Sequence, residues 1–302
     1  MIKVLSLFDG IAGARQALKN LNIDCEYYAS EIDKYAIQVA KKNHPDITHI
    51  GDVKNLICTF DNWLYPKDAN EIFVNFDLLI GGSPCQDLSI AKKDRKGLDG
   101  ERSGLFYEYV RILKECKPKF FILENVASMS KESRELISQE LFNIEPILIN
   151  SSLLTAQQRK RLYWVGKLQE DGSYKKVEIE YPQNQSQKLQ LEKDWCYATI
   201  GSSNNRIFRK TEKVSALTAS MFKGIRGAGR PIIAHKSIMS KHLDEVDKSL
   251  YRMLTLAECE RLQGFPDNYS KSISNTQRYK ALGNSFTVPV IKHILQHLFL
   301  EV

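Results

Sequence analysis

The sequence lacks any run of apolar residues long enough to span a bilayer, and it has no secretory leader pattern. From Met1 it passes directly into a strand-like segment that ends at Phe8. Its composition, 43% hydrophobic and 26% charged, is ordinary for a globular protein. We therefore expect a cytoplasmic protein with no membrane partner.

Metal-ligand spacing is also absent. The six cysteines and six histidines are scattered over 302 residues, and no Cys-x-x-Cys pair occurs. This pattern argues against the common zinc sites and against a thioredoxin-like redox pair, so we predict no bound metal.

Strand-like and helix-like segments alternate over residues 1–166, which predicts an α/β fold with a parallel sheet covered on both faces. The expected strands are Lys3–Phe8, Glu26–Glu31, Phe76–Gly81, Phe120–Asn125, Pro146–Ser151 and Leu162–Gly166. The expected helices are Ile11–Asn20, Lys34–Asn43, Ser103–Cys116 and Lys131–Phe142.

The alternation stops after Gly166. Residues 167–249 are polar and irregular, with a Gln-rich patch at 183–187, and they predict a small second domain. From Leu250 helical patterns resume, at Leu256–Gln263 and Val288–Phe299. We therefore expect boundaries near residues 166 and 249, with 250–302 as a C-terminal segment.

Positive charge is concentrated in one part of the chain. Residues 205–241 contain nine lysines and arginines and one acid, whereas the whole chain has a net charge of +7. Such clustering is typical of surfaces that bind polyanions, and a solvated basic loop is the alternative.

A glycine-containing turn, Phe8–Gly13, follows the first expected strand. Such a turn lets backbone N–H groups approach a polar cofactor at a helix N-terminus, although an ordinary tight turn has the same composition. Glu31 and Asp52 end the next two strands, where a carboxylate can bind ribose hydroxyls. The third glycine of a dinucleotide site is missing, which favours S-adenosylmethionine over NAD.

Cys85 follows a buried strand, within the segment Gly81–Gln86. Open α/β sheets carry out their chemistry at the carboxyl ends of such strands, where an accessible thiolate is a nucleophile. A buried structural cysteine is the alternative. The polar stretch 87–104 that comes next is suited to closing over a polyanion as a lid.

Three further polar motifs follow. Glu124 ends a strand, where it can act as a general acid if burial raises its pKa, or serve as a helix cap. Arg159 and Arg161 are expected to point to one side of a strand and offer two guanidinium groups, with a solvated basic turn as the alternative. Leu282–Phe286 precedes the last helix and could equally be a simple turn.

Together, in this order, the motifs resemble those of the DNA (cytosine-5)-methyltransferase family. They are Phe-x-Gly, Pro-Cys-Gln, Glu-Asn-Val, Gln-x-Arg-x-Arg, Arg-Leu-Gln-Gly-Phe-Pro and Gly-Asn-Ser. The resemblance covers nearly the whole chain outside 167–249, points to the bacterial or phage type, and extends to the eukaryotic de novo branch. Ala12 and Ala156 stand where many members have glycine and proline.

The resemblance implies a Rossmann-like S-adenosylmethionine-dependent methyltransferase sheet with a second, small target-recognition domain. Residues 1–166 would form the catalytic and cofactor-binding domain, 167–249 the target-recognition domain, and 250–302 a segment that returns to the catalytic domain. Cys85 would attack C6 of a cytosine flipped out of the duplex, because C5 is not nucleophilic until that adduct forms. The other implied catalytic residues are Glu124, Arg159 and Arg161.

The resemblance also implies two binding sets. S-adenosylmethionine would be held by Phe8, Asp9, Gly10, Ile11, Gly13, Glu31, Ile32, Asp52, Val53, Ser83, Pro84, Leu105, Asn284 and Ser285. We expect DNA contacts from Gln86, Ser89, Lys92, Arg95, Arg206, Arg209, Thr218, Ser220, Lys223, Arg226 and Arg230.

The resemblance implies double-stranded DNA as the partner and is compatible with a cognate restriction endonuclease. We expect the protein to act on DNA as a monomer. Two alternatives remain within this resemblance, a tRNA cytosine-5 methyltransferase and a DNA-binding protein that has lost catalysis. A dehydrogenase with a nucleoside cofactor would leave Cys85 and the paired arginines without a role.

Overall fold

The computed structural model describes residues 1–58, 64–66, 75–83, 104–185, 190–201, 206–225 and 230–300. Seven predicted site residues lie outside the described residues: Pro84, Cys85, Gln86, Ser89, Lys92, Arg95 and Arg226.

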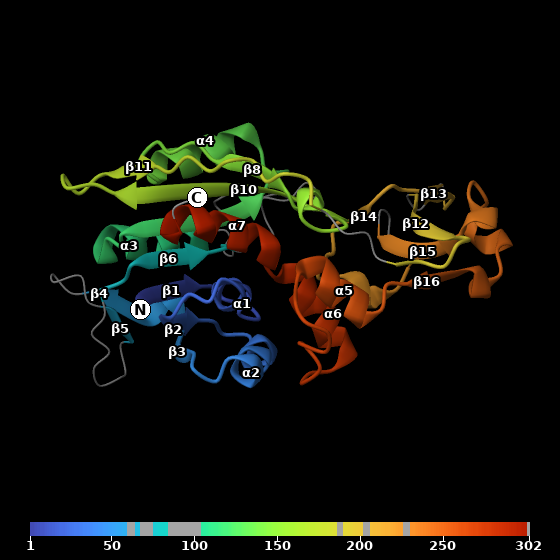
Figure 1. Cartoon of the computed structure of the whole chain (residues 1–302), viewed down its shortest axis with the longest axis horizontal. Coiled ribbons are helices and arrows are strands. Elements are labelled where there is room, and N and C mark those ends of the chain that lie inside the picture. Colours follow the sequence, from blue (N-terminus) through green and yellow to red (C-terminus); the bar gives the residue numbers. More distant parts are fainter. Residues whose placement is uncertain are drawn as a thin grey trace. The chain divides into compact units, whose positions relative to one another are not determined.

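The described chain forms helices and strands in the order shown in Figure 1. The helices are α1 Gly13–Asn20, α2 Lys34–Asn43, α3 Leu105–Cys116, α4 Lys131–Glu140, α5 Leu256–Gln263, α6 Asn275–Asn284 and α7 Val288–Phe299. The strands are β1 Ile2–Leu7, β2 Cys25–Ser30, β3 Thr48–Gly51, β4 Leu56–Cys58, β5 Leu64–Pro66, β6 Leu78–Gly81, β7 Phe120–Val126, β8 Ile147–Asn150, β9 Gln157–Gln158, β10 Lys160–Leu168, β11 Tyr174–Lys176, β12 Trp195–Ile200, β13 Phe208–Lys210, β14 Val214–Ser215, β15 Pro231–His235 and β16 Tyr251–Met253.

The principal sheet has the strand order β11-β10-β7-β6-β1-β2-β3, with β8 paired to β10. Strands β7, β6, β1, β2 and β3 are mutually parallel, which confirms the α/β prediction. The expectation of a parallel sheet is wrong at one edge, because β10 pairs antiparallel with β7 and β11 antiparallel with β10. Only a short 3-10 helix, Ser151–Leu153, and the two-residue strand β9 separate β8 from β10, and a parallel strand would need a longer crossover connection.

The order in which the chain adds strands to the sheet reverses at β1. From β1 the chain adds β2 and then β3 on one side, whereas β6 and β7 lie on the other. In open α/β sheets, ligands bind in the crevice at such a switch point, outside the carboxyl ends of the strands. The residues that follow β1, β2, β3, β6 and β7 therefore line one crevice.

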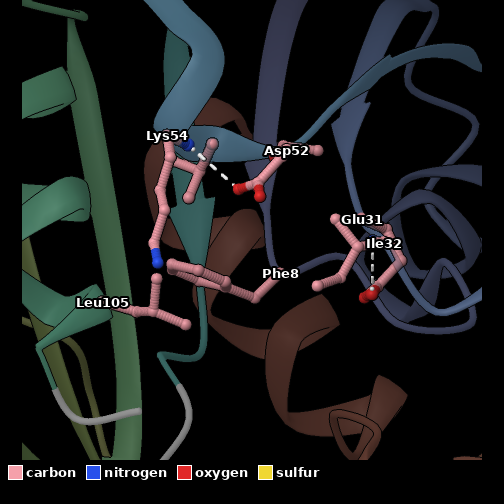
Figure 2. A pocket seen from close by; sticks show the side chains of 8 residues that line it. Phe8, Glu31, Ile32, Asp52, Lys54 and Leu105 are labelled. Atoms are coloured by element: carbon pink, nitrogen blue, oxygen red, sulfur yellow. Dashed lines mark hydrogen bonds between the residues drawn. The ribbon is translucent and has the colours of Figure 1, made fainter. Parts of the chain in front are cut away.

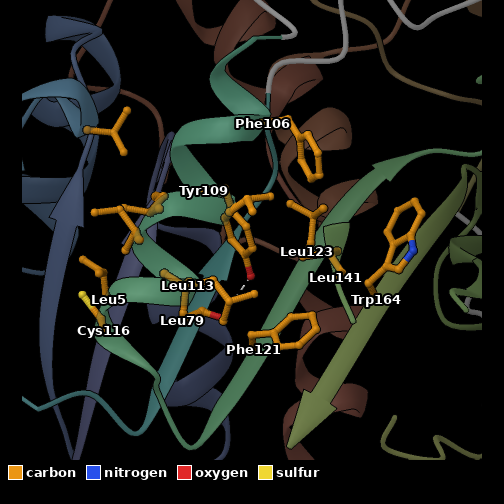
Figure 3. Packing of buried hydrophobic residues seen from close by; sticks show 14 of the residues in the cluster. Leu5, Leu79, Phe106, Tyr109, Leu113, Cys116, Phe121, Leu123, Leu141 and Trp164 are labelled. Carbon is orange, nitrogen blue, oxygen red and sulfur yellow. Dashed lines mark hydrogen bonds between the residues drawn. The ribbon is translucent and has the colours of Figure 1, made fainter. Parts of the chain in front are cut away.

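Helix α3 packs on this sheet through a core of large apolar side chains (Figure 3). Phe106, Tyr109 and Leu113 of α3 are fully buried against Leu79 of β6 and Phe121 of β7. Burial of each such side chain stabilises the fold by roughly 1.5–3 kcal/mol. This core fixes the ends of β6 and β7 relative to one another.

The chain divides into two compact units, and each is described by itself. The first comprises Met1–Ile149, Lys160–Tyr181 and Ile291–Val302, and the second Asn150–Arg159 and Pro182–Val290. The expected boundary at 166 differs from this division because β10 continues to Leu168 and β11 pairs with it. Residues 250–290 belong to the second unit, since β16 pairs with β15, and only the last residues return to the first unit.

The second unit contains a four-stranded antiparallel sheet, β13-β12-β15-β16. Its small core is built from alternate β12 residues, Ala198 and Ile200, with Phe208, Ile232 and Ala234 from the neighbouring strands. Helix α5 begins with a capping box in which Thr255 and Glu258 bond each other's backbone N–H groups. Among the described residues, no helix is both long and apolar enough to cross a membrane.

Candidate active site

The turn between β1 and α1 has an unusual backbone. Phe8, Gly10 and Ala12 all adopt left-handed conformations, with φ of 57°, 61° and 61°. Glycine enters this region freely, whereas a residue with a Cβ is strained there by roughly 1–2 kcal/mol. The alanine at position 12, a departure from the common glycine, therefore tolerates strain at the start of α1.

Glu31 fixes the geometry of that turn. One of its carboxylate oxygens accepts a hydrogen bond from the Gly10 N–H at 2.8 Å, and the other accepts from the N–H groups of Ile32 and Asp33, each at 2.8 Å. A carboxylate has about four acceptor positions, so Glu31 can still bind one further donor. It thus couples the ends of β1 and β2.

A pocket opens at the carboxyl ends of β1, β2 and β3 in the first unit (Figure 2). In this view the Phe8 ring lies between the side chains of Leu105 and Asp52. Asp52 uses one carboxylate oxygen to accept the Lys54 N–H at 3.0 Å, which leaves its other oxygen for a ligand. The lining residues are Phe8, Ser30, Glu31, Ile32, Asp52, Val53, Lys54 and Leu105.

An aromatic ring, aliphatic side chains and two carboxylates suit a nucleoside, because a base can pack on the apolar surface while hydroxyl groups donate to the carboxylates. The structure thus brings together Phe8, Glu31, Ile32, Asp52, Val53 and Leu105 of the predicted cofactor set. Two other residues of that set are buried: Ile11 lies in the turn before α1, and Gly13 is the first residue of α1.

Asp9 points into the protein rather than into the pocket. It is 3% exposed, and its carboxylate accepts a hydrogen bond from the Tyr27 hydroxyl at 2.6 Å. Burial raises the pKa of Asp9 to about 7, against the opposing effect of the Tyr27 hydroxyl. Its charge thus changes near neutral pH.

We expect Asp9→Asn to stabilise the protein above pH 7 and to have little of this effect near pH 4. Between these values the unfolded chain loses the Asp9 proton while the folded protein keeps it, so wild-type stability falls as pH rises through this window. A shift from 3.8 to about 7 corresponds to a free-energy difference on the order of 4 kcal/mol. Urea unfolding of both proteins across this range measures the difference.

Asp24→Asn, at an exposed position, is the control and should show no such trend. A difference between Asp9→Asn and wild type that does not change with pH would contradict the prediction.

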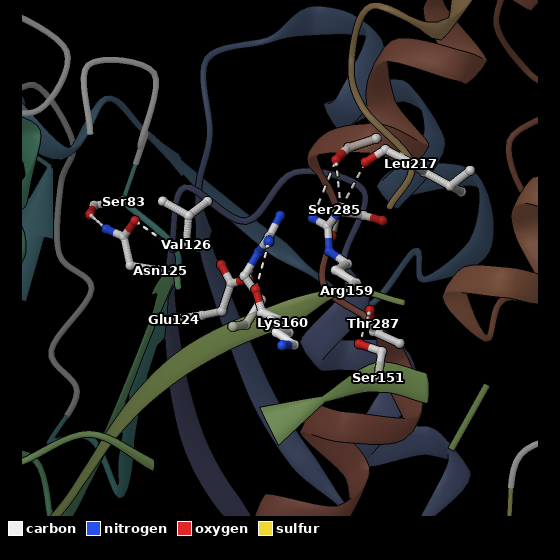
Figure 4. Close-up of polar contacts among 12 residues, drawn as sticks. Ser83, Glu124, Asn125, Val126, Ser151, Arg159, Lys160, Leu217, Ser285 and Thr287 are labelled. Carbon is white, nitrogen blue, oxygen red and sulfur yellow. Dashed lines mark hydrogen bonds and ion pairs between the residues drawn. The ribbon is translucent and has the colours of Figure 1, made fainter. Parts of the chain in front are cut away.

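The carboxyl ends of β6 and β7 are joined by a buried hydrogen bond (Figure 4). The Asn125 side-chain amide donates to the Ser83 hydroxyl at 3.2 Å, while its oxygen accepts the Val126 N–H at 2.8 Å. Both residues are almost fully buried. Asn125 therefore holds the backbone two residues before Cys85.

Glu124 and Arg161 form an ion pair beside this bond. The Arg161 Nε and a Glu124 carboxylate oxygen are 2.8 Å apart, and the side chains are 16% and 13% exposed. The two residues lie on paired antiparallel strands, β10 and β7, where Arg161 is opposite Val126. A carboxylate and a guanidinium are thus held at the carboxyl end of β7, within the crevice of the first unit.

Arg159 has different partners from Arg161, and a joint action of the two arginines on a substrate stays a prediction. Arg159 is 3% exposed, and its guanidinium donates to the carbonyl oxygens of Leu217 at 2.9 Å, Gly283 at 3.3 Å and Ser285 at 3.1 Å (Figure 4). It precedes β10 and lies in the second unit. These contacts cross-link three backbone positions.

Sequence reasoning did not single out the glutamines that complete this network. Gln157 accepts from the Leu217 N–H at 2.7 Å and donates to the Gln263 side chain at 3.2 Å. Gln263 donates in turn to the Leu282 carbonyl at 2.6 Å and accepts from the Thr287 hydroxyl at 3.0 Å. The only signal was their place inside recognised motifs, because nothing local predicts a buried contact across 106 residues.

The remaining predicted residues lie in the second unit. Ser285 is buried and bonds the Leu282 carbonyl, whereas Asn284 is exposed. Among the predicted DNA contacts, Arg209, Thr218 and Lys223 are exposed. Arg206 forms an ion pair with Asp244 at 3.9 Å. The hydroxyl groups of Thr218 and Ser220 are hydrogen-bonded at 3.1 Å, and the Arg230 guanidinium donates to the Gly224 carbonyl.

The chain is similar to known proteins along its length. The family model described as C-5 cytosine-specific DNA methylase matches residues 2–195 and 184–300. Type II methyltransferase M1.ScrFI of Lactococcus lactis subsp. cremoris is 31% identical over 328 residues, covering 99% of this chain and 78% of that protein. Type II methyltransferase M.NlaX of Neisseria lactamica is 30% identical, covering 99% and 96%.

Solved structures also share the fold of this chain. The Entamoeba histolytica methyltransferase EhMeth superposes with a TM-score of 0.71 at 20% identity, covering 99% of this chain and 98% of that one. The similarity therefore extends over both units.

Proposed function

Since the chain belongs to the C-5 cytosine-specific DNA methylase family and is a DNA cytosine-5 methyltransferase, we propose that it methylates a cytosine flipped out of a short, specific duplex sequence through a covalent Cys85–C6 adduct. In this proposal the first unit carries out the chemistry and the second unit recognises the target sequence. The chain would act as a monomer on double-stranded DNA.

The Glu124–Arg161 ion pair is the observation that carries the proposal. Addition of a thiolate to C6 places negative charge on the pyrimidine ring, and a proton at N3 together with a cation near O2 would stabilise that charge. Glu124 would hold N3 and the exocyclic amine, and Arg161 would hold O2. Asn125, bonded to Ser83, would fix the chain that leads to Cys85.

S-adenosylmethionine is the cofactor that this family uses, and it would supply an electrophilic methyl group at C5. Phe8, Leu105 and Val53 would contact the adenine, while Asp52 and Glu31 would accept hydrogen bonds from the amine and the ribose. We further propose that Arg159 is a positioning residue rather than a substrate ligand, since three carbonyl oxygens occupy its guanidinium.

We expect bisulfite sequencing of plasmid DNA from cells that express the chain to show protected cytosines in one short context. Glu124→Gln should reduce the methylation rate by about 10²- to 10³-fold, because the variant keeps the side-chain shape but cannot supply a proton at N3. Glu135→Gln, at an exposed glutamate of α4, is the matched control.

Unprotected plasmid DNA in the presence of folded wild-type protein would count against the proposal. In that case incubation with tRNA and labelled S-adenosylmethionine would identify the tRNA methyltransferase alternative, and DNA binding without methyl transfer to either would identify a catalytically silent protein.

A further inference from the structure

A second pocket, of about 680 Å³, lies in the second unit and includes three lysines of the basic stretch 205–241. It is formed by the segment before β12, by β12 itself and by the residues that follow β13 and β15. The lining residues are Leu191, Glu192, Lys193, Trp195, Cys196, Tyr197, Lys210, Thr211, Glu212, Lys213 and Lys236.

Positive charge in this pocket converges from separate segments. Four lysines and two glutamates line the pocket. The hydrogen bond with Glu258 is the main cause that raises the pKa of the Arg252 guanidinium, and Glu192 adds a minor contribution. Burial raises the pKa of the Cys196 thiol, and the positive charges of Lys210 and Lys236 partly oppose this effect. The pocket thus favours an anion.

Neighbouring contacts hold the lysines in place. The Lys236 ammonium donates to the Lys193 carbonyl, and the Lys213 ammonium donates to the Ser152 carbonyl at 2.5 Å. An ammonium group has three donors, so these bonds orient the Lys236 charge without using all of its donors. The cations are therefore oriented before a ligand arrives.

The floor of the pocket offers both apolar and polar contacts. The half-buried Trp195 ring packs edge-on against His235, with ring centroids 6.0 Å apart. The Thr211 hydroxyl oxygen is buried and has no hydrogen-bond partner in the described part of the chain. A buried hydroxyl without a partner costs about 1–3 kcal/mol, which a ligand oxygen would offset.

We propose that this pocket binds a phosphodiester group of the DNA backbone, with lysines on the phosphate, the Thr211 hydroxyl on a phosphate oxygen and Trp195 against the deoxyribose. The inference rests on the proposed function, because it gives the second unit a contact that anchors DNA without reading its sequence. Backbone contacts set affinity and orientation, whereas base contacts set specificity.

The test compares the full-length wild-type protein with the triple variant Lys193→Gln, Lys210→Gln, Lys236→Gln on a duplex that contains its methylated context. We expect the triple variant to lose about 10- to 100-fold in DNA affinity near 0.1 M salt, and its slope of log affinity against log salt to be less steep by about 2–3. The methylated sequence context and the rate at saturating DNA should not change.

Two control proteins make the result specific. Lys41→Gln, Lys42→Gln, Lys175→Gln removes the same charge from exposed positions of the first unit and should retain affinity. The Lys→Arg form of the pocket triple keeps the charge and should also retain it. Equal losses in the pocket and control triples, with wild-type methylation intact, would overturn this inference and leave the proposed function standing.

A loss of affinity for tRNA but not for DNA would overturn the inference in favour of an RNA backbone. Wild-type protein that neither binds nor methylates DNA would overturn both the inference and the proposed function.

Discussion

Replacement of Cys85 by alanine is expected to abolish methyl transfer, with a rate loss of at least about four orders of magnitude. Carbon 5 of cytosine becomes nucleophilic only after the thiolate adds to C6, and alanine has no group that can add. In the proposed mechanism C5 would use the electron pair it gains to bond the methyl group as the S–CH3 bond of the sulfonium donor breaks and S-adenosylhomocysteine leaves. Loss of the C5 proton to a base and elimination of the Cys85 thiolate would then restore the ring. Transfer of labelled methyl groups to DNA measures the loss.

Cofactor binding should survive this substitution. The described residues that line the pocket we assign to S-adenosylmethionine come from the ends of β1, β2 and β3 and from Leu105, and loss of one thiol leaves these contacts in place. Calorimetric titration should therefore give similar affinity for both proteins. Cys25→Ala, at a half-buried free cysteine, is the matched control and should retain activity. Methylation that persists in Cys85→Ala would rule out the covalent mechanism.

Gly283→Ala should destabilise the protein by about 2–4 kcal/mol, although alanine is the better helix former. A Cβ at position 283 would lie 2.3 Å from the carbonyl carbon of Thr218 and 2.4 Å from the Ala219 nitrogen, both backbone atoms. The segment cannot retreat easily, because Arg159 and Gln157 bond both polar backbone groups of Leu217. Thermal and urea unfolding measure the change.

The matched control uses the same helix. Thr276 is exposed near the start of α6, and Thr276→Ala should be neutral or slightly stabilising because only helix propensity changes. If Gly283→Ala unfolded at or above the wild-type temperature, the close approach of Thr218 to α6 would not be a constraint on the folded protein.

Local pattern was sufficient for much of the fold. The predicted bounds of α2, α5 and α7 agree with the structure, because each helix has apolar residues at helical spacing or a clear N-cap such as Asp33, which accepts the Tyr35 N–H at 2.9 Å. Helix α6 was not predicted. It buries only Arg278, Leu282 and Gly283, so it has no apolar stripe, and Gly283 and Asn284 both disfavour helix.

The sequence by itself determined six strands of the first unit with the helices between them, the family, and the polar residues that follow those strands, since these depend on local periodicity and on motifs of a few residues. It did not predict the short strands β4, β5 and β11. Only the tertiary structure decided the partners of those residues. It placed Arg161 against Glu124, buried Arg159 beneath Leu217 and Gly283, turned Asp9 inward and assembled the lysine pocket. Each of these depends on contacts between residues far apart in the chain, and such contacts leave no periodic signal in the sequence.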